Sequence, residues 1–123
     1  MKRYVRESGS DDVRTAMQAD SEWFVCRIGF VEVIRAVHVA GYPSAERRLR
    51  AEWPRLNVID VDQVLADRAA TLARSKTLRS LDALHLAAAL LLQPDDLTVL
   101  TWDRRLHAAA REHGLTVSPD ALD

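Results

Sequence analysis

The sequence predicts an α/β fold in three layers, with a mostly parallel sheet flanked by helices on both faces. Short apolar runs rich in β-branched residues alternate along the chain with longer segments that have helical spacing of apolar residues. Most of these runs are continuously apolar, which is typical of strands buried on both faces. Strands that alternate with helices in this way form parallel sheets.

The predicted elements follow one another with short connections. Helices are expected, in chain order, over residues 10–19, 29–39, 43–53, 62–73, 80–92 and 103–113. Strands are expected over residues 23–26, 56–61, 97–102 and 115–117. The run 97–102 has the strongest strand character, since it is apolar and rich in Thr and Val. Each strand except the last is therefore followed by a helix.

Capping residues justify the helix ends in order. Gly41 ends the second helix and Pro43 opens the third, as the conformational preferences of these residue types favour. Asp62, Ser80 and Asp103 stand where the N-caps of the last three helices belong. Residues 93–96 have the composition of a turn, and Gly114 closes the last helix.

Composition limits the classes of function. The 123 residues suit one domain spanning 1–123, and 48% hydrophobic with 28% charged residues is ordinary for a globular protein. The net charge of −1 provides no general positive field, so any contact with RNA must be local. Cys26 is the only cysteine and is expected to be buried, which fits a reducing compartment. No segment predicts a membrane span or a secretory signal, and the expected location is cytoplasmic.

Three acidic residues stand where a parallel sheet would bring them to one edge. Glu32 lies within an apolar helix face, where a lone carboxylate is costly unless it is paired or binds metal. Asp82 opens an otherwise apolar helix, and Asp103 joins a strand to a helix at the edge where α/β proteins bind ligands. Taken singly, each has an ordinary structural explanation: a salt bridge, a first-turn charge and an N-cap.

Together, the three carboxylates predict a site for Mg²⁺ or Mn²⁺, because hard cations of this kind prefer oxygen ligands. His85 lies one turn after Asp82 and is interpreted as a core histidine, with a role near a metal as the alternative. Trp102 is interpreted as core, with stacking on a base as the alternative. Arginines with forked donors for phosphate surround the acids in sequence, at positions 27, 35, 79, 104 and 105.

Three segments together resemble the PIN domain, and within it the VapC toxins of bacterial toxin-antitoxin pairs. Residues 26–36 (CRIGFVEVIRA) look like the family's helix with its second acid. Residues 79–90 (RSLDALHLAAAL) are similar to its third-acid motif, and residues 100–106 (LTWDRRL) to its fourth. The similarity to residues 79–90 is the most specific, and the resemblance runs from Lys2 to the C-terminus.

The resemblance implies that Glu32, Asp82 and Asp103 are catalytic metal ligands, with Thr101 as a polar neighbour. It implies endonucleolytic cleavage of RNA with Mg²⁺ or Mn²⁺, silencing by a cognate VapB-like antitoxin, and a homodimer. The residues predicted to contact the RNA substrate are Arg27, Arg35, Arg104 and Thr101.

The sequence departs from the family pattern at its start. VapC-like chains begin with a central strand that carries the first Asp, whereas residues 2–8 match the end of the helix that follows that strand. We therefore expect an N-terminally incomplete PIN-like domain without its first strand, whose true reading frame starts upstream of Met1. If Met1 is genuine, we expect weak metal binding and impaired activity. The alternatives are a catalytically impaired remnant that binds antitoxin or regulates, and a PIN-type nuclease outside toxin-antitoxin systems.

Overall fold

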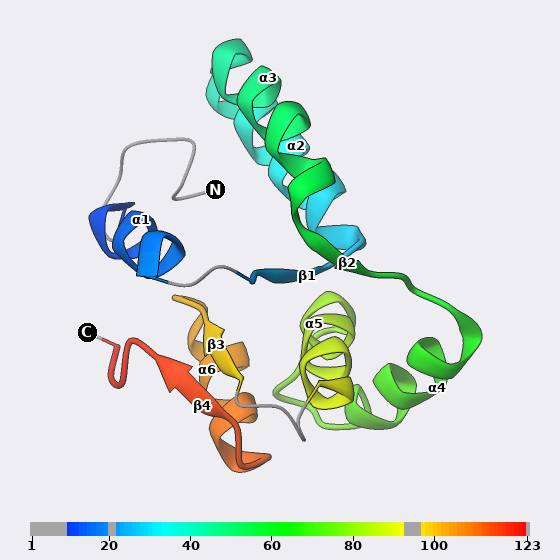
Figure 1. Cartoon of the computed structure of the whole chain (residues 1–123). Helices are drawn as coiled ribbons and strands as arrows, with labels where there is room; N and C mark the ends of the chain where they lie inside the picture. The colour runs from blue at the N-terminus through cyan, green and yellow to red at the C-terminus, as the bar shows by residue number, and fades with distance from the viewer. Residues whose placement is uncertain (1–9, 20–21, 93–96, 123) are drawn as a thin grey trace. The chain divides into compact units, whose positions relative to one another are not determined.

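The computed structural model describes residues 10–19, 22–92 and 97–122 and consists of two compact units (Figure 1). Unit 1 is Met1–Ile59 and unit 2 is Asp60–Asp123.

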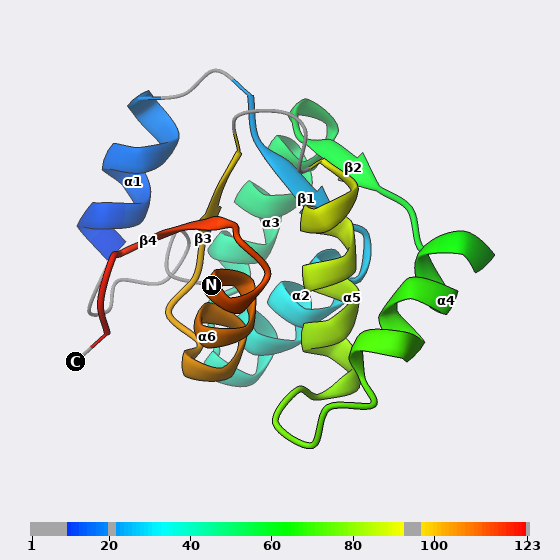
Figure 2. The same cartoon turned by 90° about the horizontal axis from the view of Figure 1, so that it is seen from below.

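Unit 1 contains a helical hairpin and a pair of short parallel strands. Its elements are α1 (Ser10–Ala19), β1 (Phe24–Cys26), α2 (Ile28–Ala40), α3 (Pro43–Glu52), a 3₁₀ turn η1 (Trp53–Arg55) and β2 (Asn57–Ile59). Strands β1 and β2 pair in parallel, with Val25 opposite Val58. Helices α2 and α3 lie side by side in both views (Figures 1 and 2), as their contacts require. Cys26 is buried, with 3% of its surface exposed, as predicted.

The sharp turn between α2 and α3 depends on Gly41. This residue adopts φ +79°, a left-handed conformation that glycine reaches without the steric cost of a Cβ. The following amide, that of Tyr42, donates to the Val37 carbonyl at 3.1 Å and so satisfies the end of α2. Val37 and Ala45 then pack together in the buried core of the hairpin, with Val33 against them.

Unit 2 is built around one apolar helix. Its elements are α4 (Gln63–Leu72), α5 (Ser80–Leu91), β3 (Thr98–Leu100), α6 (Arg104–Glu112) and β4 (Thr116–Ser118). Helix α5 lies between α4 and α6 and contacts both (Figure 2). The small side chains Ala83 and Ala87 and the larger Leu86 are at most 1% exposed. The Ala-rich sequence thus lets neighbouring helices approach α5 from two sides.

Strand β4 and the segment after it pack beside α6 in unit 2, and β4 pairs with β3. The two strands are parallel, with Val99 opposite Val117. After β4, the chain is anchored to α6, because the buried His107 donates from Nε2 to the Pro119 carbonyl at 2.6 Å. Arg111 also donates to the Asp120 carbonyl at 2.8 Å.

All predicted helices and strands between residues 10 and 118 are present, with small differences at their ends. Strands β1, β2 and β3 are shorter than predicted, with three residues each, whereas β4 has the predicted three residues but begins one position later. Ser80 was expected to cap α5 but is its first residue; Arg79 occupies the N-cap position and makes no side-chain cap bond. The predicted turn at 93–96 and the opening segment 2–8 lie outside the described residues.

Parallel pairing is confirmed in both units. The described strands form two two-stranded sheets, β1–β2 and β3–β4. A single domain over 1–123 and a missing first strand stay predictions. Within the described part of the chain, no helix has the length and apolar character that a membrane crossing requires.

Candidate active site

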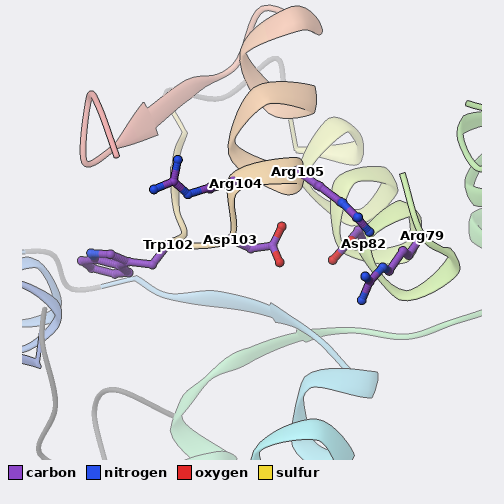
Figure 3. A pocket seen from close by; sticks show the side chains of 6 residues that line it. All are labelled: Arg79, Asp82, Trp102, Asp103, Arg104 and Arg105. Carbon is purple, nitrogen blue, oxygen red and sulfur yellow. The ribbon is translucent and has the colours of Figure 1, made fainter. Parts of the chain in front are cut away.

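Unit 2 carries a hollow of about 300 Å³ that combines acidic and basic side chains (Figure 3). Its lining residues come from the start of α5 and from the junction of β3 with α6, and they are Arg79, Asp82, Trp102, Asp103, Arg104 and Arg105. We call it the unit 2 hollow. All six residues belong to one compact unit, so packing within that unit sets its geometry.

The helix starts explain why these side chains meet. Asp82 is in the first turn of α5, where a carboxylate complements the positive end of the helix dipole. Arg79 is the N-cap residue of the same helix, and its side chain extends beside Asp82 (Figure 3). Asp103 is the N-cap of α6, and α6 packs against α5, so the two helix starts meet at the unit 2 hollow.

Hydrogen bonds fix the position of Asp103. Its Oδ1 accepts the Leu106 N–H at 2.8 Å, which is the standard N-cap bond. Its own backbone N–H donates to the hydroxyl oxygen of Thr101 at 3.1 Å. The Thr101 N–H in turn donates to the carbonyl of Ser118, the last residue of β4, at 3.1 Å. Thr101 is therefore a polar neighbour that holds the Asp103 backbone.

The carboxylates of Asp82 and Asp103 point toward one another across the unit 2 hollow (Figure 3). The cap bond uses one lone pair on Oδ1 of Asp103. The other lone pairs of its two carboxylate oxygens can accept a cation. Two facing carboxylates with room for water fit Mg²⁺ or Mn²⁺, which bind proteins through few carboxylates and keep several waters. Within residues 10–19, 22–92 and 97–122, no three His, Cys, Asp or Glu side chains are grouped closely enough to hold a metal.

The arginines make the unit 2 hollow electropositive despite its two acids. Three arginines against two aspartates leave a formal excess of one positive charge. Arg79 and Arg105 extend beside Asp82, whereas Arg104 and Trp102 lie on the other side of Asp103 (Figure 3). This local field is of the sign that attracts a polyanion, although the net charge of the whole chain is −1.

The predicted site residues divide between the two units. The unit 2 hollow is lined by three of them: Asp82, Asp103 and Arg104. Thr101 does not line it but accepts a hydrogen bond from the backbone N–H of Asp103. The other three, Glu32, Arg27 and Arg35, belong to unit 1. The convergence of Glu32 with the two aspartates stays a prediction.

In unit 1, Glu32 is half-buried in the first half of α2. Arg27 lines a separate hollow of about 270 Å³ with Phe30, Val31 and Trp53. The rings of Phe30 and Trp53 meet edge to face at 5.0 Å. This second hollow is lined by apolar side chains and one arginine, so it does not offer the oxygen ligands of a hard cation.

Three residues of the unit 2 hollow were not among those predicted to bind substrate. Arg79 and Arg105 were interpreted more generally, as arginines near the acids whose forked donors suit phosphate, and their closeness in sequence to Asp82 and Asp103 was the signal. Trp102 was interpreted as core, yet its side chain is half-buried and lines the hollow. Its place directly before the N-cap, beyond the last paired residue of β3, explains this position.

The fold and site define an α/β protein with parallel strands and an acidic site flanked by arginines at a strand-to-helix junction. A family model for the PIN domain matches residues 4–112. The chain therefore belongs to the PIN domain family.

Its relatives are nucleases by name. The chain is 32% identical to Ribonuclease VapC47 of Mycobacterium tuberculosis (strain CDC 1551 / Oshkosh) over 126 aligned positions, 98% of this chain and 92% of that protein. It is 39% identical over 80 residues to Ribonuclease VapC45 of the same strain, 65% of this chain and 56% of that protein. Ribonuclease VapC49 of Mycobacterium tuberculosis (strain ATCC 25618 / H37Rv) matches to the same extent. The chain thus spans little more than half the length of these last two relatives.

A solved structure titled as a toxin-antitoxin complex from Klebsiella pneumoniae has a similar fold. The TM-score is 0.70 with 23% identity, over 94% of this chain and 89% of that chain. This likeness supports the assigned fold.

Proposed function

We propose that this protein is an endoribonuclease that cuts RNA with Mg²⁺ or Mn²⁺ and acts as the toxin of a VapBC toxin-antitoxin pair. One observation carries the proposal: in the unit 2 hollow, Asp82 and Asp103 face each other among three arginines. The names of its relatives, Ribonuclease VapC47 and Ribonuclease VapC45, supply the type of substrate.

The residues divide the chemistry between them. Asp82 and Asp103 would hold the cation, with Glu32 as the third ligand. When bound, a divalent cation supplies an activated water and offsets the charge that develops on the phosphate. The guanidinium groups of Arg79, Arg104 and Arg105 would bind and orient the phosphates of the RNA through their forked donors.

The site has acceptors and cations but does not itself present a nucleophilic Ser or Cys among its lining residues. Hydrolysis by water therefore suits it better than a covalent enzyme intermediate. The remnant alternative predicts partner binding without cleavage.

The test is cleavage of a labelled single-stranded RNA with Mn²⁺, with Mg²⁺ and with EDTA. We expect cleavage that requires metal, and loss of at least a hundredfold in Asp82→Asn, which has nearly the same shape as Asp82 but one charge fewer. Circular dichroism establishes that the variant is folded. An N-terminally extended chain, where the genome encodes one, is compared in the same assay. Equal cleavage by folded Asp82→Asn and the wild-type chain would refute the ligand role.

The partner is tested apart from the chemistry. A VapB-like antitoxin encoded beside this gene is expected to co-purify with the chain and to inhibit cleavage. Co-purification without any cleavage by the extended chain would favour the impaired remnant. A homodimer is part of the proposal, and its mass in solution can be measured by light scattering. A cytoplasmic location is likewise proposed, and fractionation of cells checks it.

A further inference from the structure

We propose that Trp102 is a base-stacking residue, so that a single strand of RNA crosses the unit 2 hollow with nucleotides on both sides of the carboxylate pair. One base stacks on Trp102 with a phosphate on Arg104, and phosphate on the far side contacts Arg79 and Arg105. This inference rests on the proposed function and names the path of its substrate.

The placement of the side chains sets this path. Trp102 and Arg104 lie on one side of Asp103, and Arg79 and Arg105 extend beside Asp82 on the other (Figure 3). The carboxylates occupy the middle. Arginines on two sides of a cation-binding centre are suited to the successive phosphates of a strand.

The state of Trp102 favours a base as its ligand. Trp102 is half-buried and lines the hollow. It comes two positions after β3 ends at Leu100, so it is not part of the strand. A large aromatic ring beside cations is the combination by which proteins hold unpaired bases, which stack on rings regardless of sequence. In a duplex, stacking on the neighbouring base pairs covers both faces of a base, so the substrate class is single-stranded RNA.

This path predicts how the protein selects substrates. The strand continues past the carboxylate pair in both directions on this path, so the chain would cut within a strand and would not need a free end. Preference among bases would be modest, because stacking strength and not hydrogen bonding to base edges selects them.

The test measures binding in EDTA, where cleavage does not occur. The probe is a single-stranded RNA of twelve nucleotides with 2-aminopurine moved through successive positions, read by anisotropy and by quenching of the 2-aminopurine. We expect quenching at one or two positions. Trp102→Ala should weaken binding about fivefold to a hundredfold and remove the quenching, while Trp102→Phe keeps binding within about fivefold.

Arginine variants test the path on the two sides. Arg104→Gln and Arg105→Gln should each lower the slope of log Kd against log salt by about 0.7, since each removes one phosphate contact with a single strand. Arg68→Gln is the matched control, because Arg68 is an exposed arginine of α4 outside the lining of the hollow. It should leave both affinity and slope unchanged.

The outcomes separate the two proposals. Wild-type affinity in Trp102→Ala, quenching at no position, or no binding of RNA overturns the strand path. If Asp82→Asn then still abolishes metal-dependent cleavage, the proposed function stands without this path. Binding that depends on Trp102 and the arginines, with no cleavage in either metal, supports the path and refutes the nuclease.

Discussion

A pair of substitutions can separate the capping by Asp103 from its proposed binding of metal. Asp103 caps α6 through a bond of 2.8 Å from the Leu106 N–H, and it is a predicted metal ligand. Asp62 caps α4 through an equivalent bond of 2.8 Å from the Leu65 N–H, but it does not line the unit 2 hollow. Asp62 is thus a matched control for capping without metal binding.

The loss of a cap has a calculable effect on stability. Replacement of an N-cap Asp by Ala costs about 1 kcal/mol, whereas Asn caps almost as well. For 123 residues, an unfolding entropy of about 2.1 cal/mol/K per residue converts 1 kcal/mol to a fall in Tm of about 4 °C. We expect this fall in both Asp62→Ala and Asp103→Ala without metal, and a smaller one in Asp62→Asn and Asp103→Asn.

The response to Mn²⁺ distinguishes the two sites. A cation at ten times its Kd stabilises the folded chain by about 1.4 kcal/mol, which raises Tm by about 5 °C. Thermal unfolding followed by circular dichroism should show this rise in the wild-type chain and in both Asp62 variants, but in neither Asp103 variant. The ligand role is refuted if folded Asp103→Asn responds to Mn²⁺ as the wild-type chain does. If Asp62→Ala also lost the rise of Tm with Mn²⁺, the loss in the Asp103 variants would be explained by weaker helix capping and not by loss of a metal ligand.

Three further substitutions test the third ligand, a turn and the core. Glu32→Gln should abolish the rise of Tm with Mn²⁺ while changing the metal-free Tm by less than about 4 °C; an undiminished rise would exclude Glu32 as a ligand. Gly41→Ala should lower the free energy of unfolding by about 1 kcal/mol in urea titrations, because φ +79° strains any residue with a Cβ although the space around it is open. Leu86→Ala should lower the same quantity by about 2–5 kcal/mol, because Leu86 is 1% exposed and its loss leaves a cavity; a loss below 1 kcal/mol would contradict its place in the core.

The local parts of the fold were predictable because they depend on near neighbours in sequence. Asp62 and Asp103 cap their helices by bonds to residues three positions ahead, as predicted. Gly41 and Gly114 both adopt positive φ values at the ends of α2 and α6. The prediction that Ser80 caps α5 was wrong by one position. The backbone of Arg79 has the extended conformation of an N-cap residue, so the helix already begins at Ser80.

Features that depend on packing between distant segments were less predictable. Strand lengths were overestimated, because apolar residues at the strand ends satisfy the pattern without having a paired neighbour. The side chain of Trp102 looks like core in sequence, and only the end of β3 pairing at Leu100 places it at the hollow. The meeting of Arg105 with Asp82 likewise requires that α5 and α6 pack together.

The capping of α6 and the proposed binding of metal support one another. The bond from Leu106 holds Oδ1 of Asp103, and the bond to Thr101 holds the backbone of the same residue. A carboxylate with one oxygen held, on a backbone that is held as well, loses little further conformational freedom when a cation binds, so less of the binding free energy is spent on ordering it. The structural explanation of Asp103 is therefore not an alternative to its catalytic one, because the cap provides the preorganisation that a metal ligand needs.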